Sequence, residues 1–136
     1  MIGQQQKDQA EKWFKDLRDK ICEDFEILEE DHLKLAPKSD MAAKKFERKS
    51  TIRETDDKED GGGGVMATLK GGRIFEKVGV NVSAVYGNLA PEAQKSITAR
   101  KAIPELKDDP RFWASGISLV AHMRNPHTPA IHLNTR

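Results

Sequence analysis

The residues best suited to chemistry lie in the stretch from Phe112 to Arg136, which reads FWASGISLVAHMRNPHTPAIHLNTR. Two apolar runs in it are joined by a loop that contains Pro126 and Pro129. Side chains two residues apart on a strand share a face, so an antiparallel pairing of the runs would gather a hydroxyl, two imidazoles, an amide and a guanidinium. Those groups predict a ligand with carboxylates. The residues are Ser118, Val120 and His122 in the first run and His132, Asn134 and Arg136 in the second.

Arg136 and His132 have the most direct chemical uses in this set. The planar fork of a guanidinium binds a carboxylate through two hydrogen bonds, although an arginine on a bare surface is the commoner occurrence. An imidazole exchanges a proton near neutral pH, so His132 suits proton transfer, with a structural histidine as the alternative. His122 and His132 are two imidazoles, whereas a catalytic zinc normally takes three protein ligands. These two alone do not make a metal site.

Composition excludes several classes of protein. The 136 residues include 23 basic and 22 acidic side chains, so the net charge of +1 gives no bulk attraction to nucleic acid. The single cysteine, Cys22, rules out a disulfide within the chain and suits a reducing compartment. No apolar run reaches the ~18–20 residues of a membrane span, and no signal-peptide core follows Met1. We therefore expect a cytoplasmic protein without a membrane span or a nucleic-acid partner.

The first 60 residues predict one helix and a connecting segment. Apolar residues spaced by three and four predict a helix over 4–30 that docks on a core. Residues 31–60 have poor periodicity and are interpreted as a surface segment, with a helical turn over 41–46 and with Phe46 and Ile52 tucked in. The helical stripe consists of Ala10, Trp13, Phe14, Leu17, Ile21, Cys22, Phe25 and Leu28.

Residues 61–136 predict a sheet. The run Gly61–Gly64 is either a flexible linker or backbone that must come close to a neighbour. Strand patterns over 65–69, 73–78 and 80–86 predict an antiparallel meander, and Pro91 opens a predicted helix over 91–101. After a loop over 102–110 comes the hairpin that carries the polar residues. The fold class is therefore α+β, with a mainly antiparallel sheet flanked by helices.

The same region carries a family resemblance. It is similar to the aerobic, oxygen-dependent coproporphyrinogen III oxidases of haem biosynthesis, in a bacterial form. The matching pieces are Gly61–Gly64 leading into Ile74-Phe75-Glu76-Lys77, then Gly79-Val80-Asn81-Val82-Ser83, Gly116-Ile117-Ser118, Asn125-Pro126-His127 and His132-Leu133-Asn134-Thr135-Arg136.

The resemblance implies oxidative decarboxylation of coproporphyrinogen III. The ring A and B propionates would become the vinyl groups of protoporphyrinogen IX, with molecular oxygen as acceptor and no organic cofactor. It also implies a homodimer. By resemblance, Ser118, Asn134, Thr135 and Arg136 contact the substrate, His132 donates a proton, and His122 with His132 bind a divalent metal, as in some bacterial members.

Family members run to roughly twice this length, so the resemblance implies that residues 1–136 are a partial oxidase domain. In that case two further family histidines and the distal part of the site would lie beyond Arg136. Two other hypotheses stay open at this point. One is a truncated, non-catalytic fragment whose open strand edge pairs with another chain. The other is a porphyrin-binding half-domain that binds its ligand without turnover.

Overall fold

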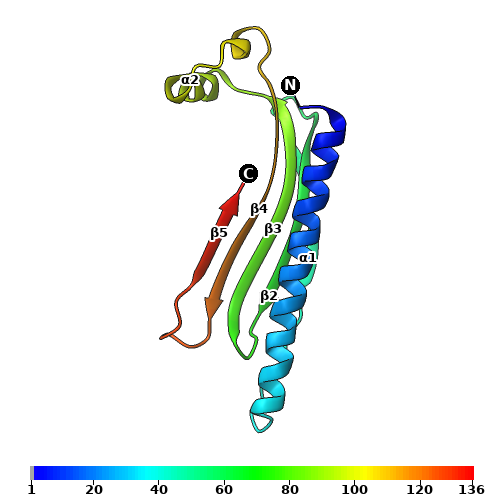
Figure 1. The fold of residues 1–136 in the computed structure, drawn as a ribbon, viewed down its shortest axis with the longest axis vertical. Coiled ribbons are helices and arrows are strands. Elements are labelled where there is room, and N and C mark those ends of the chain that lie inside the picture. The colour runs from blue at the N-terminus through cyan, green and yellow to red at the C-terminus, as the bar shows by residue number, and fades with distance from the viewer. Residues whose placement is uncertain (1) are drawn as a thin grey trace.

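A computed structural model describes residues 2–136 and contains two α-helices, a short 3-10 helix and five strands. Helix α1 comes first, three strands follow it, and α2 with the 3-10 helix η1 separates them from the last two strands (Figure 1). This is the α+β arrangement that the sequence predicts. The elements are α1 (Gln4–Leu35), β1 (Glu47–Glu54), β2 (Asp60–Lys70), β3 (Phe75–Asn88), α2 (Pro91–Arg100), η1 (Pro104–Lys107), β4 (Arg111–Met123) and β5 (Ile131–Thr135).

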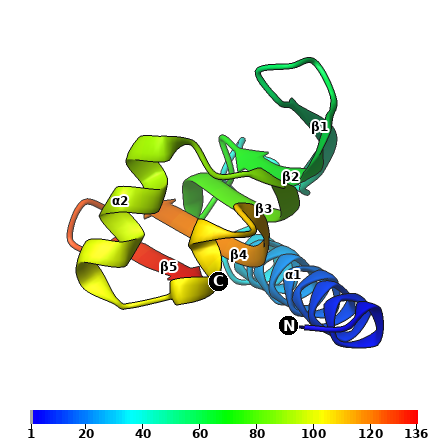
Figure 2. The same ribbon diagram turned by 90° about the horizontal axis from the view of Figure 1, so that it is seen from above.

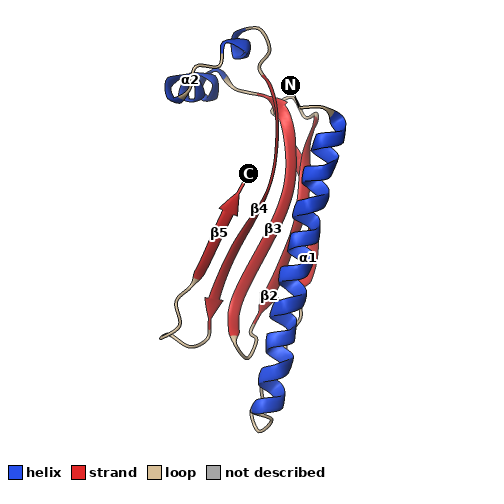
Figure 3. Cartoon of the chain, in the orientation of Figure 1, coloured by secondary structure: helices blue, strands red, loops and turns tan. Residues whose placement is uncertain are grey.

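The five strands form one sheet in the order β1-β2-β3-β4-β5, and every neighbouring pair is antiparallel. Helix α1 runs along one face of this sheet, as the secondary-structure colouring of Figure 3 makes plain. Helix α2 lies at one end of the strands, on the side away from α1 (Figure 2). We call the face that α1 packs on the covered face and the opposite one the open face.

The core lies between α1 and the covered face. Alternate residues of β3 and β4, such as Val80 and Leu119, are almost fully buried there, as period-two alternation requires. The predicted helical stripe is correct for Cys22 and for the four residues that pack on the core, and wrong for Trp13, which is 61% exposed, and Leu28, which is 46% exposed. The four packed residues are Phe14, Leu17, Ile21 and Phe25.

A buried carboxylate fixes α1 to the turn between β2 and β3. Glu29 is fully buried, and its two oxygens accept hydrogen bonds from the backbone N–H groups of Arg73 (2.7 Å), Ile74 (2.8 Å) and Phe75 (3.0 Å), with Lys44 N–H more distant at 3.4 Å. Burial alone would raise the pKa of Glu29. The four backbone donors together lower it by more than burial raises it, so the pKa lies below the usual value. The carboxylate is therefore held ionised by the turn that it stabilises.

The prediction for residues 31–60 was largely wrong. Helix α1 continues to Leu35, β1 occupies Glu47–Glu54, and residues 41–46 form no helical turn. Phe46 packs against the core as predicted, whereas Ile52 is 83% exposed. Every residue of β1 is exposed and the strand is rich in charge, so its sequence lacks the apolar alternation that identifies a strand.

The glycine run is strand, not linker. All four glycines lie within β2, and a side chain at Gly64 would meet the carbonyl oxygen of Val82 at 2.2 Å. The backbone therefore approaches the next strand too closely for any other residue. The predicted strands 73–78 and 80–86 are one strand, β3, that continues through Gly79. The helix predicted over 91–101 is confirmed as Pro91–Arg100, with the proline in its first turn.

Candidate functional site

The polar residues of the last two strands meet on the open face. Strand pairing places Ser118 directly opposite Asn134 and Val120 directly opposite His132. Directly opposed residues share a face, and Leu119, between Ser118 and Val120, is buried on the covered face. The predicted antiparallel hairpin is therefore confirmed. His132, Asn134 and Arg136 are exposed there, while Ser118 is half-buried.

A glycine holds Arg136 beside this row. Gly116 lies on the open face opposite Ser83, one step along β4 from Ser118. A side chain at Gly116 would lie 2.3 Å from the Thr135 carbonyl oxygen and 2.7 Å from Arg136 Cγ. The arginine stem thus crosses the sheet where β4 offers bare backbone. This places a guanidinium on the same face as the hydroxyl of Ser118.

Thr135 is oriented differently from its neighbours. It pairs with Ile117, whose side chain is buried on the covered face, so the Thr135 side chain lies on the side opposite to Asn134 and Arg136. Its backbone stays in the row, where its carbonyl oxygen lies against Gly116. A substrate contact by Thr135 would therefore come from its main chain, and its role stays a prediction.

His122 and His132 are diagonal neighbours on the open face. His132 pairs with Val120, and His122 is two residues further along β4, a separation of about 7–8 Å between Cα atoms. Within residues 2–136, no three or more His, Cys, Asp or Glu side chains gather into a group that could hold a metal ion. Two imidazoles do not complete the three-ligand set of a catalytic metal, so a metal at this place would need another protein ligand.

The open face is basic at both ends. Lys77 pairs with Lys70 on one side and with His122 on the other, so two lysine ammonium groups and an imidazole form a row near the β2–β3 turn. Arg136 supplies a cation about 20 Å away, since the two rows are six residues apart along β4. Between them lie the rows of Gly79 and Asn81. A ligand with several acidic arms fits this distribution of charge.

Asn81 is the residue of this face that sequence reasoning missed as a site residue. It pairs with Ser118, so it continues the Ser118–Asn134 row onto β3. Its Oδ1 atom is shielded from solvent and accepts no hydrogen bond from any part of the chain that the structure describes. Its residue type could have identified it from the sequence, because asparagine is disfavoured inside strands.

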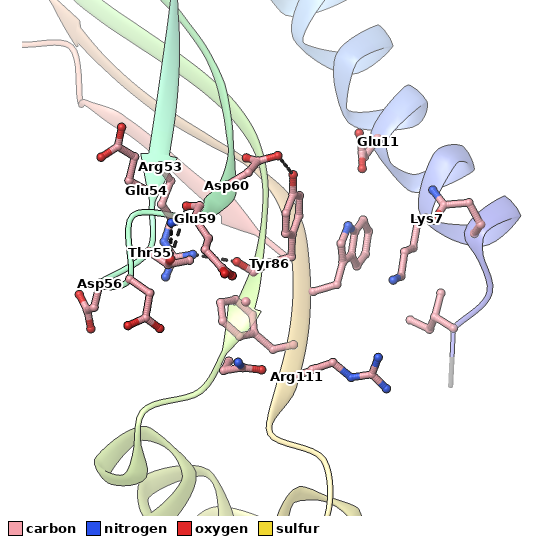
Figure 4. Close-up of a pocket in the computed structure, with 17 residues that line it drawn as sticks. Lys7, Glu11, Arg53, Glu54, Thr55, Asp56, Glu59, Asp60, Tyr86 and Arg111 are labelled. Carbon is pink, nitrogen blue, oxygen red and sulfur yellow. Dashed lines mark hydrogen bonds between the residues drawn. The ribbon is translucent and has the colours of Figure 1, made fainter.

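A separate hollow of about 900 Å³ lies at the far end of the sheet, beside the β1–β2 turn and the start of α1 (Figure 4). Arg53 donates to the Tyr86 carbonyl oxygen at 3.0 Å and lies over the Phe112 ring. The Tyr86 hydroxyl donates to Asp60 at 2.5 Å, a bond that lowers the pKa of Asp60 and raises that of Tyr86. This hollow contains none of the predicted site residues.

No helix in the described part of the chain, residues 2–136, is long and apolar enough to cross a membrane.

Comparison with known proteins places this sequence in a family. The family model for coproporphyrinogen III oxidase matches residues 9–136. The oxygen-dependent coproporphyrinogen-III oxidase of Rickettsia felis is 45% identical over 130 residues, which cover 96% of this chain and 41% of the relative. The enzyme of the same name from Rickettsia peacockii is 45% identical over 124 residues, or 91% of this chain and 39% of the relative. The chain thus spans about two fifths of the length of these relatives.

Proposed function

The chain belongs to the coproporphyrinogen III oxidase family, and we propose that the open face of its sheet binds coproporphyrinogen III for oxidative decarboxylation by molecular oxygen. The observation that carries this proposal is the placement of Ser118, His132, Asn134 and Arg136 on one face. That face offers donors for carboxylates and bare backbone on which a macrocycle can lie.

The reaction assigns each group a task. A propionate arm, oxygen and one proton become a vinyl group, carbon dioxide and hydrogen peroxide. The bond to the carboxylate and one C–H bond on the carbon next to the pyrrole break, the vinyl double bond forms, and that hydrogen and two electrons pass to oxygen. Arg136 would hold a propionate through its guanidinium, and Asn134 with Ser118 would orient it. His132, in the next row, would supply the proton that the balance requires.

The proposal extends to location and assembly, both of which the family resemblance suggests. A cytoplasmic location is supported by Cys22, a buried free thiol whose pKa burial raises to about 11, so that it stays protonated. A homodimer is proposed for the full-length family member. Size-exclusion chromatography with light scattering would test it, and a monomer at micromolar concentration would contradict it.

The direct test uses a grafted protein in which residues 9–136 replace the matching segment of the Rickettsia felis relative. This grafted protein is expected to convert coproporphyrinogen III to protoporphyrinogen IX with release of carbon dioxide and peroxide. A folded graft without product, beside an active parent, would refute the proposed activity. Binding of the substrate without product would instead support a porphyrin-binding module.

A further inference from the structure

Asn81 lies at the centre of the open face. It is half-buried on β3, with Met66 of β2 on one side of its row and Ser118 of β4 on the other. Gly79 and Ser83, its neighbours on the same face of β3, are small. The surroundings therefore leave the amide as the main polar group in the middle of this face.

The amide oxygen of Asn81 is unpaired at a cost to stability. A buried acceptor without a donor is unfavourable, and Oδ1 has no donor within residues 2–136. A residue that breaks a local rule without gain to the fold is commonly one that serves a site. Since Met66 is flexible and 36% exposed, a ligand laid on this face can displace it and reach the amide.

The chemistry of the oxygen selects the part of the ligand that it would meet. A carbonyl oxygen accepts hydrogen bonds only, so it cannot bind a propionate, but it can bind an N–H group. The reduced tetrapyrrole has four pyrrole N–H groups, and its saturated bridges let the rings tilt and point them to one side. The oxidised porphyrin is flat, and its remaining N–H groups lie in the ring plane.

We propose that Asn81 is a specificity-determining residue that accepts a hydrogen bond from a pyrrole N–H of the reduced macrocycle. The inference rests on the proposed function, because it takes its ligand from there. Arg136 lies two strands away, about 10 Å across the sheet, and one row or about 7 Å along it. Arg136 would thus hold an acidic arm while Asn81 contacts the centre of the ring.

The test compares two ligands and two substitutions by calorimetry, with oxygen excluded. The chain is titrated with coproporphyrinogen III and with coproporphyrin III. The unsubstituted chain is expected to prefer the reduced ligand, and Asn81→Leu to lose about tenfold in affinity for it alone. Asn81→Asp, which keeps acceptor oxygens, should retain the preference. Asn88→Leu, at the far end of the same strand, is the matched control.

Stability separates this role from a structural one. Removing an unpaired acceptor should leave the melting temperature of Asn81→Leu equal or higher, while binding of the reduced ligand falls. If Asn81→Leu binds each ligand as tightly as the unsubstituted chain does, the inference is overturned and the proposed function still stands. If the unsubstituted chain binds neither ligand, the proposed function fails and the inference fails with it.

Discussion

The two faces of this sheet are made by the same strands and are used in opposite ways. On the covered face, Val80 and Leu119 pack against α1, and the buried charge of Glu29 has a full set of backbone donors. On the open face, Asn81 and Ser118 occupy the intervening positions, and the Asn81 oxygen has no partner within residues 2–136. Period-two alternation lets one strand stabilise the fold with one set of side chains and offer the other set to a ligand.

Substitutions on the covered face should destabilise the fold, and Glu29→Ala should lower the free energy of unfolding the most. The substitution removes the acceptor of three short hydrogen bonds and leaves the backbone N–H groups that donate them buried and unpaired. We expect the free energy of unfolding to fall by about 3–5 kcal/mol, measured by urea denaturation. Glu30→Ala, at the exposed next position of α1, is the control and should change little. Similar losses of stability in both variants would show that the hydrogen bonds between Glu29 and the β2–β3 turn do not account for the effect.

Acid should weaken the covered face through the same carboxylate. The folded-state pKa of Glu29 is lowered, so its contribution is fully present above the unfolded pKa of about 4.5 and is lost as pH falls through the folded pKa. Glu29→Gln, which cannot ionise, should be less stable than the unsubstituted chain by about 2–3 kcal/mol at pH 7. That difference should shrink toward pH 2 in denaturation curves taken across this range. A constant difference would mean that Glu29 is not the titrating group.

The fold was predictable where one side of an element is apolar. The apolar stripe of α1, apart from Trp13 and Leu28, and the Pro91 start of α2 are local signals, and the structure confirms both. Strand β1 was missed because all eight of its residues are exposed, so it is held by backbone pairing that leaves no pattern in the sequence. The buried charge of Glu29 was missed because its partners in the β2–β3 turn are distant in the chain.

Substitutions on the open face should weaken ligand binding without unfolding the protein, and Arg136→Ala should do so most clearly. Its loss from the grafted protein removes a charged anchor worth about 1.5–3 kcal/mol, so KM should rise roughly 10- to 150-fold. The urea midpoint should stay the same, because Arg136 is exposed. Arg100→Ala, on α2, is the control. An unchanged KM would remove Arg136 from the site.

The candidate site was predictable in its members and not in its extent. Alternation placed Ser118, His132, Asn134 and Arg136 on one face, which agrees with the strand pairing and with the contact of Arg136 at Gly116. Asn81 was not predicted as a site residue, because its membership depends on pairing between β3 and β4 across a connection of more than 20 residues. Sequence spacing alone cannot give such a register.

The smallest effect should come from Ser115, the counterpart of Asn81 on the other side of the sheet. Its Oγ atom is also buried and has no partner in residues 2–136, beside a cavity of about 170 Å³ that Arg18 lines as well. Ser115→Ala should leave the free energy of unfolding within about 0.5 kcal/mol, or raise it, and should not alter ligand binding.

Ser118→Ala is the matched variant, because Ser118 is three residues further along β4 and lies on the open face. It should also leave urea denaturation unchanged, but it should weaken tetrapyrrole binding in calorimetry. A loss of binding in Ser115→Ala equal to that in Ser118→Ala would break the distinction between the faces, because the sheet itself separates Ser115 from the open face.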